Sequence, residues 1–281
     1  MTQTPTPDLD TLEAAVEARM AEQPGATVAV AVRDAHTGTT WALRGDRSFH
    51  AASTMKVPVM IEVYRQAEAG RLALTDSLAV VNQFRSIVDG STYAIVDDSD
   101  DAIYTRLGTP MAVEDLVHAM ITVSSNLATN LLIDTLAADT IQATAERLGV
   151  RTMRVLRGVE DLKAFRQGLS NTATANDLAT LLAALRDGHA VSPQSDAAMV
   201  HTLKAQRFNT MIPQGLPLGT EVAHKTGWIT EIHHDAAIVY PRDQPPYVLV
   251  ILTEGIADET VSAQLGADVA RLVHAALRPK A

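Results

Sequence analysis

The chain has 281 residues, of which 47% are hydrophobic and 20% are charged. This length and composition are typical of a globular protein with a sizeable hydrophobic core. The formal net charge is −10, and no basic cluster interrupts the acidic balance, so we expect neither nucleic acid nor an anionic membrane as a partner. Cysteine is absent, which excludes a disulfide framework and a thiolate metal site.

The N-terminal stretch "MTQTPTPDLD" has neither the basic start nor the apolar core of a signal peptide. No apolar run reaches the ~18 residues that a membrane helix needs. We therefore expect a soluble monomer. Its cellular location stays open, because removal of a signal peptide would leave the same sequence.

Residues 7–25 begin the chain with Leu9, Leu12, Val16 and Met20 on one helical stripe, which stops at Pro24-Gly25. This spacing predicts an amphipathic helix with an end signal. The next segment, 26–45, contains two apolar runs on either side of "DAHTGT". It is typical of a β-hairpin.

The middle of the chain, about residues 53–205, has mainly helical patterns. In 109–123 a helix is predicted to start at Thr-Pro, with acidic residues in its first turn. Its apolar face comprises Val113, Leu116, Val117, Met120 and Ile121. Residues 176–188 predict another helix with a glycine stop. Residues 82–110 are the longest irregular stretch, and their aspartates fit a solvated loop better than a cation site.

Three strand-like runs follow near the C-terminus, in 221–229, 235–241 and 247–255, and a last helix is predicted in 261–279. Both ends of the chain therefore build one antiparallel sheet flanked by terminal helices. A helical region is inserted between its second and third strands. A cleft between the two parts is the natural place for a site.

The stretch "AASTMKVPVM" sets Ser53 three residues before Lys56 in an apolar context. On a helix these side chains share one face. A serine hydroxyl needs a base to become a nucleophile, and a desolvated lysine amine can be that base. Such a pair alone is a weak signal, because a surface helix start can also hold a serine and a lysine.

Two further motifs strengthen the signal of the Ser53–Lys56 pair. "VSSN" places Ser124 and Asn126 directly after a helical apolar face, and "HKTG" places Lys225, Thr226 and Gly227 on a predicted strand. With five lysines in the chain, a Lys-[Ser/Thr]-Gly triplet is expected only about 0.04 times by chance.

The order S-x-x-K, S-x-N and K-T-G resembles the penicillin-recognising serine hydrolases, and the class A β-lactamases most of all. The resemblance covers nearly the whole chain. It implies an α/β (α+β) β-lactamase/transpeptidase-like fold in a single catalytic domain, 1–281. The sheet part would span about 1–52 and 215–281, and the helical part about 53–214.

The resemblance also implies roles for these residues. Ser53 would attack the substrate carbonyl, Lys56 would be the base, and Ser124 would pass a proton to the leaving nitrogen. Asn126 would bind the amide side chain of the substrate, while Lys225 and Thr226 would bind its carboxylate. The backbone N–H groups of Ser53 and Trp228 would form the oxyanion hole.

Gly227 would let the strand approach the ligand closely. The side chain of Trp228 is expected to be packing rather than chemistry. No cofactor and no metal are implied.

The sequence departs from the family in "LRGVEDLKAFRQGLSNTATA". Anchored on Arg157, this stretch puts Val159 where class A enzymes carry the glutamate that activates the deacylating water. Lys163 stands where they carry the asparagine that holds that water. Either Glu160, one place later, takes the role through a changed loop, or the role is vacant.

His233-His234-Asp235 is a poor metal site, because neighbours on a strand point to opposite faces. One of the histidines, His234 in particular, is a candidate contact for the substrate carboxylate, and a structural role is the alternative. Tyr93 and Tyr104 could line the cleft, although packing is the better expectation for both.

Three functions follow from the resemblance. The first is a β-lactamase that hydrolyses the amide of β-lactams, a small-molecule substrate. The second is a D-alanyl-D-alanine peptidase or an esterase of the same fold. The third is a penicillin-binding sensor that is acylated without turnover.

Overall fold

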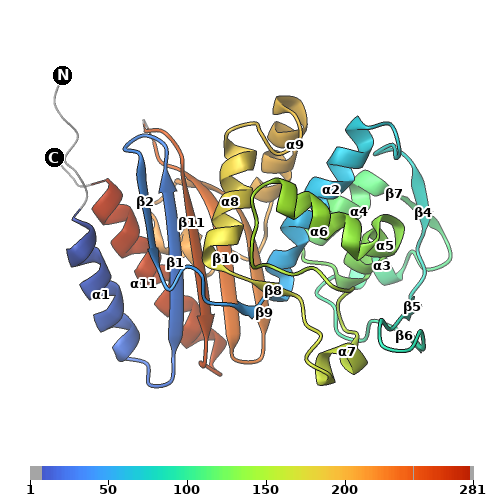
Figure 1. Cartoon of the computed structure of the whole chain (residues 1–281), viewed down its shortest axis with the longest axis horizontal. Helices are drawn as coiled ribbons and strands as arrows, with labels where there is room; N and C mark the ends of the chain where they lie inside the picture. Colours follow the sequence, from blue (N-terminus) through green and yellow to red (C-terminus); the bar gives the residue numbers. More distant parts are fainter. Residues whose placement is uncertain (1–7, 243, 279–281) are drawn as a thin grey trace.

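The computed structural model describes residues 8–242 and 244–278. Its centre is a five-stranded antiparallel sheet in the order β2-β1-β11-β10-β9 (Figure 1). The first two strands come from the start of the chain and the other three from its end, as the sequence predicts. Their bounds are Thr27–Asp34 (β1), Thr39–Leu43 (β2), Glu221–Ile229 (β9), Ile232–Tyr240 (β10) and Tyr247–Glu254 (β11).

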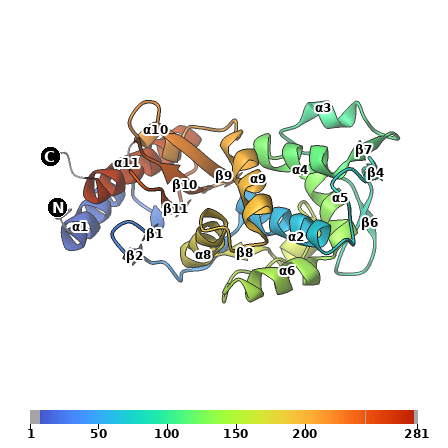
Figure 2. The same cartoon turned by 90° about the horizontal axis from the view of Figure 1, so that it is seen from above.

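Both faces of the sheet are buried. On β1, Val28, Val30 and Val32 belong to one core cluster, while Ala29 and Ala31 belong to the other. This alternation follows from the two-residue period of a strand. The first face is covered by the terminal helices, and the second by a helix of the inserted part (Figures 1 and 2). The helices are α1 (Leu9–Ala21), α11 (Glu259–Leu277) and α10 (Ile212–Gly215) on the first face, and α8 (Ala175–Arg186) on the second.

The helical part lies between β2 and β9 in the chain and beside the sheet in space (Figure 1). Its core is an apolar cluster that continues onto the inner face of the sheet. Its helices are η1 (Ala52–Met55, a 3-10 turn), α2 (Lys56–Glu68), α3 (Asp101–Tyr104), α4 (Val113–Thr122), α5 (Asn126–Leu136), α6 (Ala138–Arg147), α7 (Leu162–Arg166) and α9 (Pro193–Lys204).

Short strand pairs tie its loops together. They are β3 (Phe49–His50) with β8 (Thr172–Ala173), β4 (Ser77–Ala79) with β7 (Pro110–Ala112), and β5 (Phe84–Arg85) with β6 (Thr92–Tyr93).

The helix predicted to start at Thr109-Pro110 starts later. Pro110–Ala112 pair with Ser77–Ala79 as a strand, and α4 begins at Val113. The predicted first-turn acids, Glu114 and Asp115, are in place. Proline is compatible with an edge strand as well as with a first helical turn, so sequence alone did not separate the two.

Across residues 8–242 and 244–278, we find no helix that combines the length and apolar character needed to span a bilayer.

Candidate active site

Ser53 lies in the 3-10 turn that leads into α2. The turn is held by its neighbours: Ala51 N donates to Asn171 O at 2.9 Å, and Thr54 Oγ1 donates to Ala51 O at 2.6 Å. Ala52 is forced to a φ of +45°. This left-handed conformation costs an alanine roughly 1–2 kcal/mol. Ser53 thus remains half-buried at the positive end of the α2 dipole, on a strained and well-anchored turn.

Lys56 is completely buried at the start of α2. Its Nζ donates to Ser124 O at 2.7 Å, to Ser124 Oγ at 3.2 Å and to Asn126 Oδ1 at 2.8 Å. Burial lowers the pKa of Lys56 to about 7, although the charges of Asp98 and Glu160 act in the opposite direction. A lysine with such a pKa is partly neutral at physiological pH and can accept a proton.

Ser124 lies in the turn between α4 and α5, and Asn126 is the first residue of α5. Ser124 has a φ of +59°, and Ser125 caps α5 by accepting a hydrogen bond from Ala128 N. This conformation turns Ser124 Oγ toward both lysines, since it also accepts from Lys225 Nζ at 3.1 Å. Ser124 Oγ is therefore shared between two buried amines and is well placed to relay a proton.

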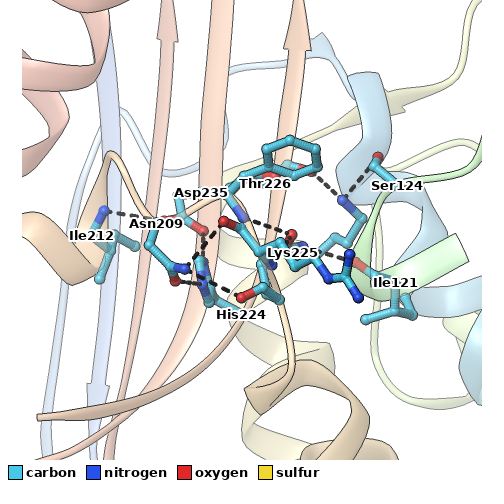
Figure 3. Close-up of polar contacts among 11 residues, drawn as sticks. Ile121, Ser124, Asn209, Ile212, His224, Lys225, Thr226 and Asp235 are labelled. Carbon is cyan, nitrogen blue, oxygen red and sulfur yellow. Dashed lines mark hydrogen bonds and ion pairs between the residues drawn. The ribbon is translucent and has the colours of Figure 1, made fainter. Parts of the chain in front are cut away.

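Lys225 extends from β9 toward Ser124, as Figure 3 shows, and is also fully buried. Its Nζ donates a second bond to Thr226 O at 2.8 Å. Burial lowers the pKa of Lys225 strongly, the charge of Lys56 acts in the same direction, and Asp235 opposes both. The charge of Lys56 thus disfavours the charged form of Lys225 across one serine hydroxyl.

Gly227 brings β9 against the turn that carries the nucleophile. A methyl group added there would lie 3.0 Å from Ser53 N and 3.1 Å from both Thr54 N and the Ala52 side chain. The absent side chain thus permits contact between β9 and η1. The next residue, Trp228, leaves 52% of its surface exposed, so its side chain packs against the protein only in part.

In the stretch that departs from the family, Val159 and Glu160 are neighbours in sequence but make different contacts. Val159 is tied by its backbone to Asn130: its N donates to Asn130 Oδ1 at 2.7 Å, and its O accepts from Asn130 Nδ2 at 3.0 Å. Glu160 follows with a φ of +59°. This left-handed residue redirects the chain, and the Glu160 carboxylate points into the site.

Glu160 Oε1 accepts a hydrogen bond from Asn126 Nδ2 at 3.2 Å, and Oε2 accepts one from Val96 N at 2.8 Å. Burial raises the pKa of Glu160. Asn126 therefore joins Glu160 to Lys56 through its two amide atoms. Lys163, in contrast, donates to Asp89 Oδ2 and Ser91 Oγ and is about half exposed. Lys163 thus points toward the loop of Asp89 and Ser91.

His234 faces Gly227 across the β9–β10 pair but is fully buried. Its Nε2 donates to His50 O at 2.9 Å, and its Nδ1 accepts from Thr253 N at 3.2 Å. Both ring nitrogens are used, and burial lowers the pKa of His234 to about 4. The geometry therefore assigns His234 to the structural alternative and argues against a carboxylate contact.

The two tyrosines are parts of the site's frame. Tyr93 packs against Phe84, and its hydroxyl accepts a hydrogen bond from Asn130 Nδ2 at 3.2 Å. Tyr104 donates its hydroxyl to Asp98 Oδ2 at 3.1 Å. Among the residues that the structure describes, no group of three or more His, Asp or Glu side chains could hold a metal ion.

Sequence reasoning missed Asp98 and Asn130. Asp98 was included in a solvated loop, but its two carboxylate oxygens accept hydrogen bonds from Asn126 N and Leu127 N, both at 2.8 Å. The run of aspartates carried no signal that would single out this one. Asn130, on the buried side of α5, could have been suspected, because a buried amide needs partners.

Comparison with known proteins agrees with this geometry. Residues 11–277 match the model of the Beta-lactamase enzyme family. Beta-lactamase AST-1 of Nocardia asteroides is 30% identical over 97% of this chain and 87% of its own length. The crystal structure of a β-lactamase from Sphaerobacter thermophilus DSM 20745 has a TM-score of 0.82 and 31% identity, covering 97% of this chain and 98% of that one.

PBP-A is similar in structure as well, with a TM-score of 0.85 and 26% identity over 99% of this chain and 100% of the other. A leucine-to-glutamate variant of PBP-A has been solved as an acyl-enzyme complex with penicillin G. The family match spans nearly the whole chain and includes each motif of the site. The chain therefore belongs to the β-lactamase enzyme family and is a serine hydrolase.

Proposed function

We propose that the protein hydrolyses the amide bond of β-lactams through an acyl-enzyme on Ser53. The observation that carries this proposal is the position of Ser124 Oγ, within 3.2 Å of Lys56 Nζ and 3.1 Å of Lys225 Nζ. A buried pair of lysines around one hydroxyl is costly for stability. We explain this destabilising arrangement by catalysis: the two lysines and Ser124 can move a proton from the serine nucleophile to the leaving nitrogen.

In acylation, Lys56 in its neutral form takes the proton of Ser53 while Ser53 Oγ attacks the lactam carbonyl. The backbone N–H groups of Ser53 and Trp228 stabilise the oxyanion, aided by the positive end of α2. As the ring C–N bond breaks, Ser124 gives its proton to the leaving nitrogen and regains one from the lysines. Lys225, Thr226 and Asn126 orient the substrate carboxylate and amide side chain.

In deacylation, we assign the base to Glu160. Its carboxylate lies one hydrogen bond from Asn126, which itself bonds to Lys56. The positive φ of Glu160 gives the side chain this direction although Val159 stands at the family's usual position. Glu160 in its ionised form would take a proton from the water that attacks the ester, and burial tunes the carboxylate toward that task.

The decisive experiment is intact-mass spectrometry of the protein mixed with penicillin G and followed over time. We expect an adduct of one penicillin on Ser53 that disappears as hydrolysed penicillin accumulates. Ser53→Ala should form no adduct, while Ser77→Ala, which changes an exposed serine on β4, should behave as the wild type. Equal adduct on Ser53→Ala would rule out this nucleophile.

The peptidase, esterase and sensor alternatives are not favoured, because the curated relatives are themselves β-lactamases. The substrate is a small molecule, and we propose that one chain suffices to bind it: each residue assigned above comes from this chain. We also propose that the sheet part and the helical part form one catalytic domain, since Ser53, Ser124 and Lys225 come from both parts.

A further inference from the structure

We propose that Asp98 is a positioning residue of the acylation step, whose carboxylate holds the turn that carries Ser124 and Asn126 and whose charge acts on buried Lys56. The inference rests on the proposed function, and it assigns a role to a loop residue that none of the three motifs contains.

The first support is the hydrogen bonding at the N-terminus of α5. The first N–H groups of a helix have no partner within it. Here Asp98 Oδ1 accepts from Asn126 N, and Oδ2 accepts from Leu127 N, each at 2.8 Å. Ser125 Oγ accepts the next N–H, that of Ala128. One carboxylate from a distant loop thus completes the cap and clamps the turn.

The second support is the strain of that turn. Ser124 has a φ of +59°, which an L-residue avoids unless its surroundings impose it. The two hydrogen bonds that Asp98 accepts come from the residues that start α5, two positions after Ser124. They hold the chain that follows Ser124 in a single direction. Tyr104 donates its hydroxyl to Asp98 Oδ2 and Asp100 N donates to Oδ1, so the carboxylate is itself oriented. Asp98 therefore fixes where Ser124 Oγ and the Asn126 amide point.

The third support is charge. The ionisable groups that act on Lys56 or on its lysine partner are Asp98, Glu160, Lys225 and, behind Lys225, Asp235. Of the carboxylates that raise the pKa of Lys56, Asp98 has the larger effect. Asp98 thus opposes the effect of burial and favours the charged form of Lys56.

The test measures the protonation of Lys56 directly. The chain has five lysines, so side-chain ¹³C-labelled lysine gives a simple NMR spectrum, and Lys56→Met assigns the signal. Asp98→Asn and Asp98→Ser both remove the charge. We expect each to lower the pKa of Lys56 by about one pH unit, the low end for a nearby opposite charge. Two neutral variants guard against a folding failure of one.

Two controls separate charge from packing. Asp101→Asn removes an exposed charge from the same loop and should leave the titration unchanged. Tyr104→Phe removes a partner of Asp98 but keeps its charge, and should leave the pKa of Lys56 near the wild-type value. The pH dependence of penicillin acylation is then measured on the same set. Its acid limb should move to lower pH with the Lys56 titration in the Asp98 variants alone.

The possible results distinguish the proposed role of Asp98 from a purely structural one. A slower acylation with an unmoved Lys56 titration would overturn the proposal, because a purely structural cap gives that result. An equal shift in Asp101→Asn would also overturn it. If the wild type forms no penicillin adduct, the proposed function fails, whereas the NMR titration still decides whether Asp98 controls Lys56.

Discussion

Replacing Gly227 by alanine tests whether contact between β9 and η1 is needed for acylation. The added methyl would sit 3.0 Å from Ser53 N and 3.1 Å from Thr54 N, both backbone atoms that cannot rotate away. Such overpacking typically costs roughly 1–3 kcal/mol. For a chain of this size, about 2 kcal/mol lowers Tm by roughly 4–8 °C.

To make room for the methyl group, β9 and η1 must move apart. This movement also separates the two proposed oxyanion donors, the N–H groups of Ser53 and Trp228. Loss of one such donor costs about 10²–10³-fold in rate. We therefore expect Gly227→Ala to reduce the rate of adduct formation with penicillin G by about 10²-fold. The assay is quenched-flow mixing followed by intact-mass spectrometry, with Tm measured on the same preparation.

Ala52→Gly offers a matched second substitution. It removes the third close contact, with the Ala52 side chain, and it relieves a φ of +45°. The double variant should recover part of the lost Tm and rate. If Gly227→Ala acylates at the wild-type rate with an unchanged Tm, the close approach has no role in catalysis and this reasoning fails.

Further predictions concern the charged groups. Glu160→Gln should retain the penicillin adduct that the wild type releases. The control is Glu231→Gln, which changes a second glutamate with positive φ and should release the adduct normally. Normal release by Glu160→Gln would remove Glu160 from the mechanism. Lys56→Met should abolish acylation, because it removes the proposed base. Adduct formation at the wild-type rate would contradict this role.

For the wild type, kcat/KM should rise as pH increases through about 7, since the neutral form of Lys56 is the base. Folding linkage has the same sign: the lowered pKa of Lys56 destabilises the fold fully below about 7, and this penalty fades as pH rises toward the unfolded value of 10.5. Asp34→Ala, which leaves Arg278 buried without its partner, should cost roughly 3 kcal/mol in thermal denaturation.

Local patterns predicted most of the fold. The hairpin, the C-terminal strands and the helices at both ends follow from apolar periods and turn residues that need no tertiary information. The predicted start of α4 was wrong because Pro110 fits two local structures. Its pairing with the strand Ser77–Ala79 is a contact between separate segments, which the local pattern does not contain. Motif order, rather than the physics of the segments, pointed to Lys56, Ser124, Asn126 and Lys225, whose side chains hydrogen-bond to one another.

Other parts of the site could not be read from sequence. Glu160, with its positive φ, accepts a hydrogen bond from Asn126, and Asp98 accepts one because its loop passes the N-terminus of α5. His234 is excluded as a ligand by bonds to His50 O and Thr253 N, which come from two other strands. Each of these facts depends on contacts between distant segments, which a linear pattern does not encode.

The insertion of the helical part between β2 and β9 has a consequence for synthesis. Strand β1 pairs along its whole length with β11, from Thr27↔Glu254 to Asp34↔Tyr247. The hairpin β1–β2 leaves the ribosome early, yet its second neighbour is among the last strands to emerge. Non-local pairing of this kind is slow, and an unpaired strand edge is prone to aggregation while it waits.

The helical part lies between these strands in the chain, but its core continues onto the sheet, including residues of β10 and β11. The sheet is completed only after residue 254 has emerged, and Lys225 is held on that sheet. A chain whose β11 has not yet emerged therefore presents an unpaired β1 edge and lacks the completed sheet that holds Lys225.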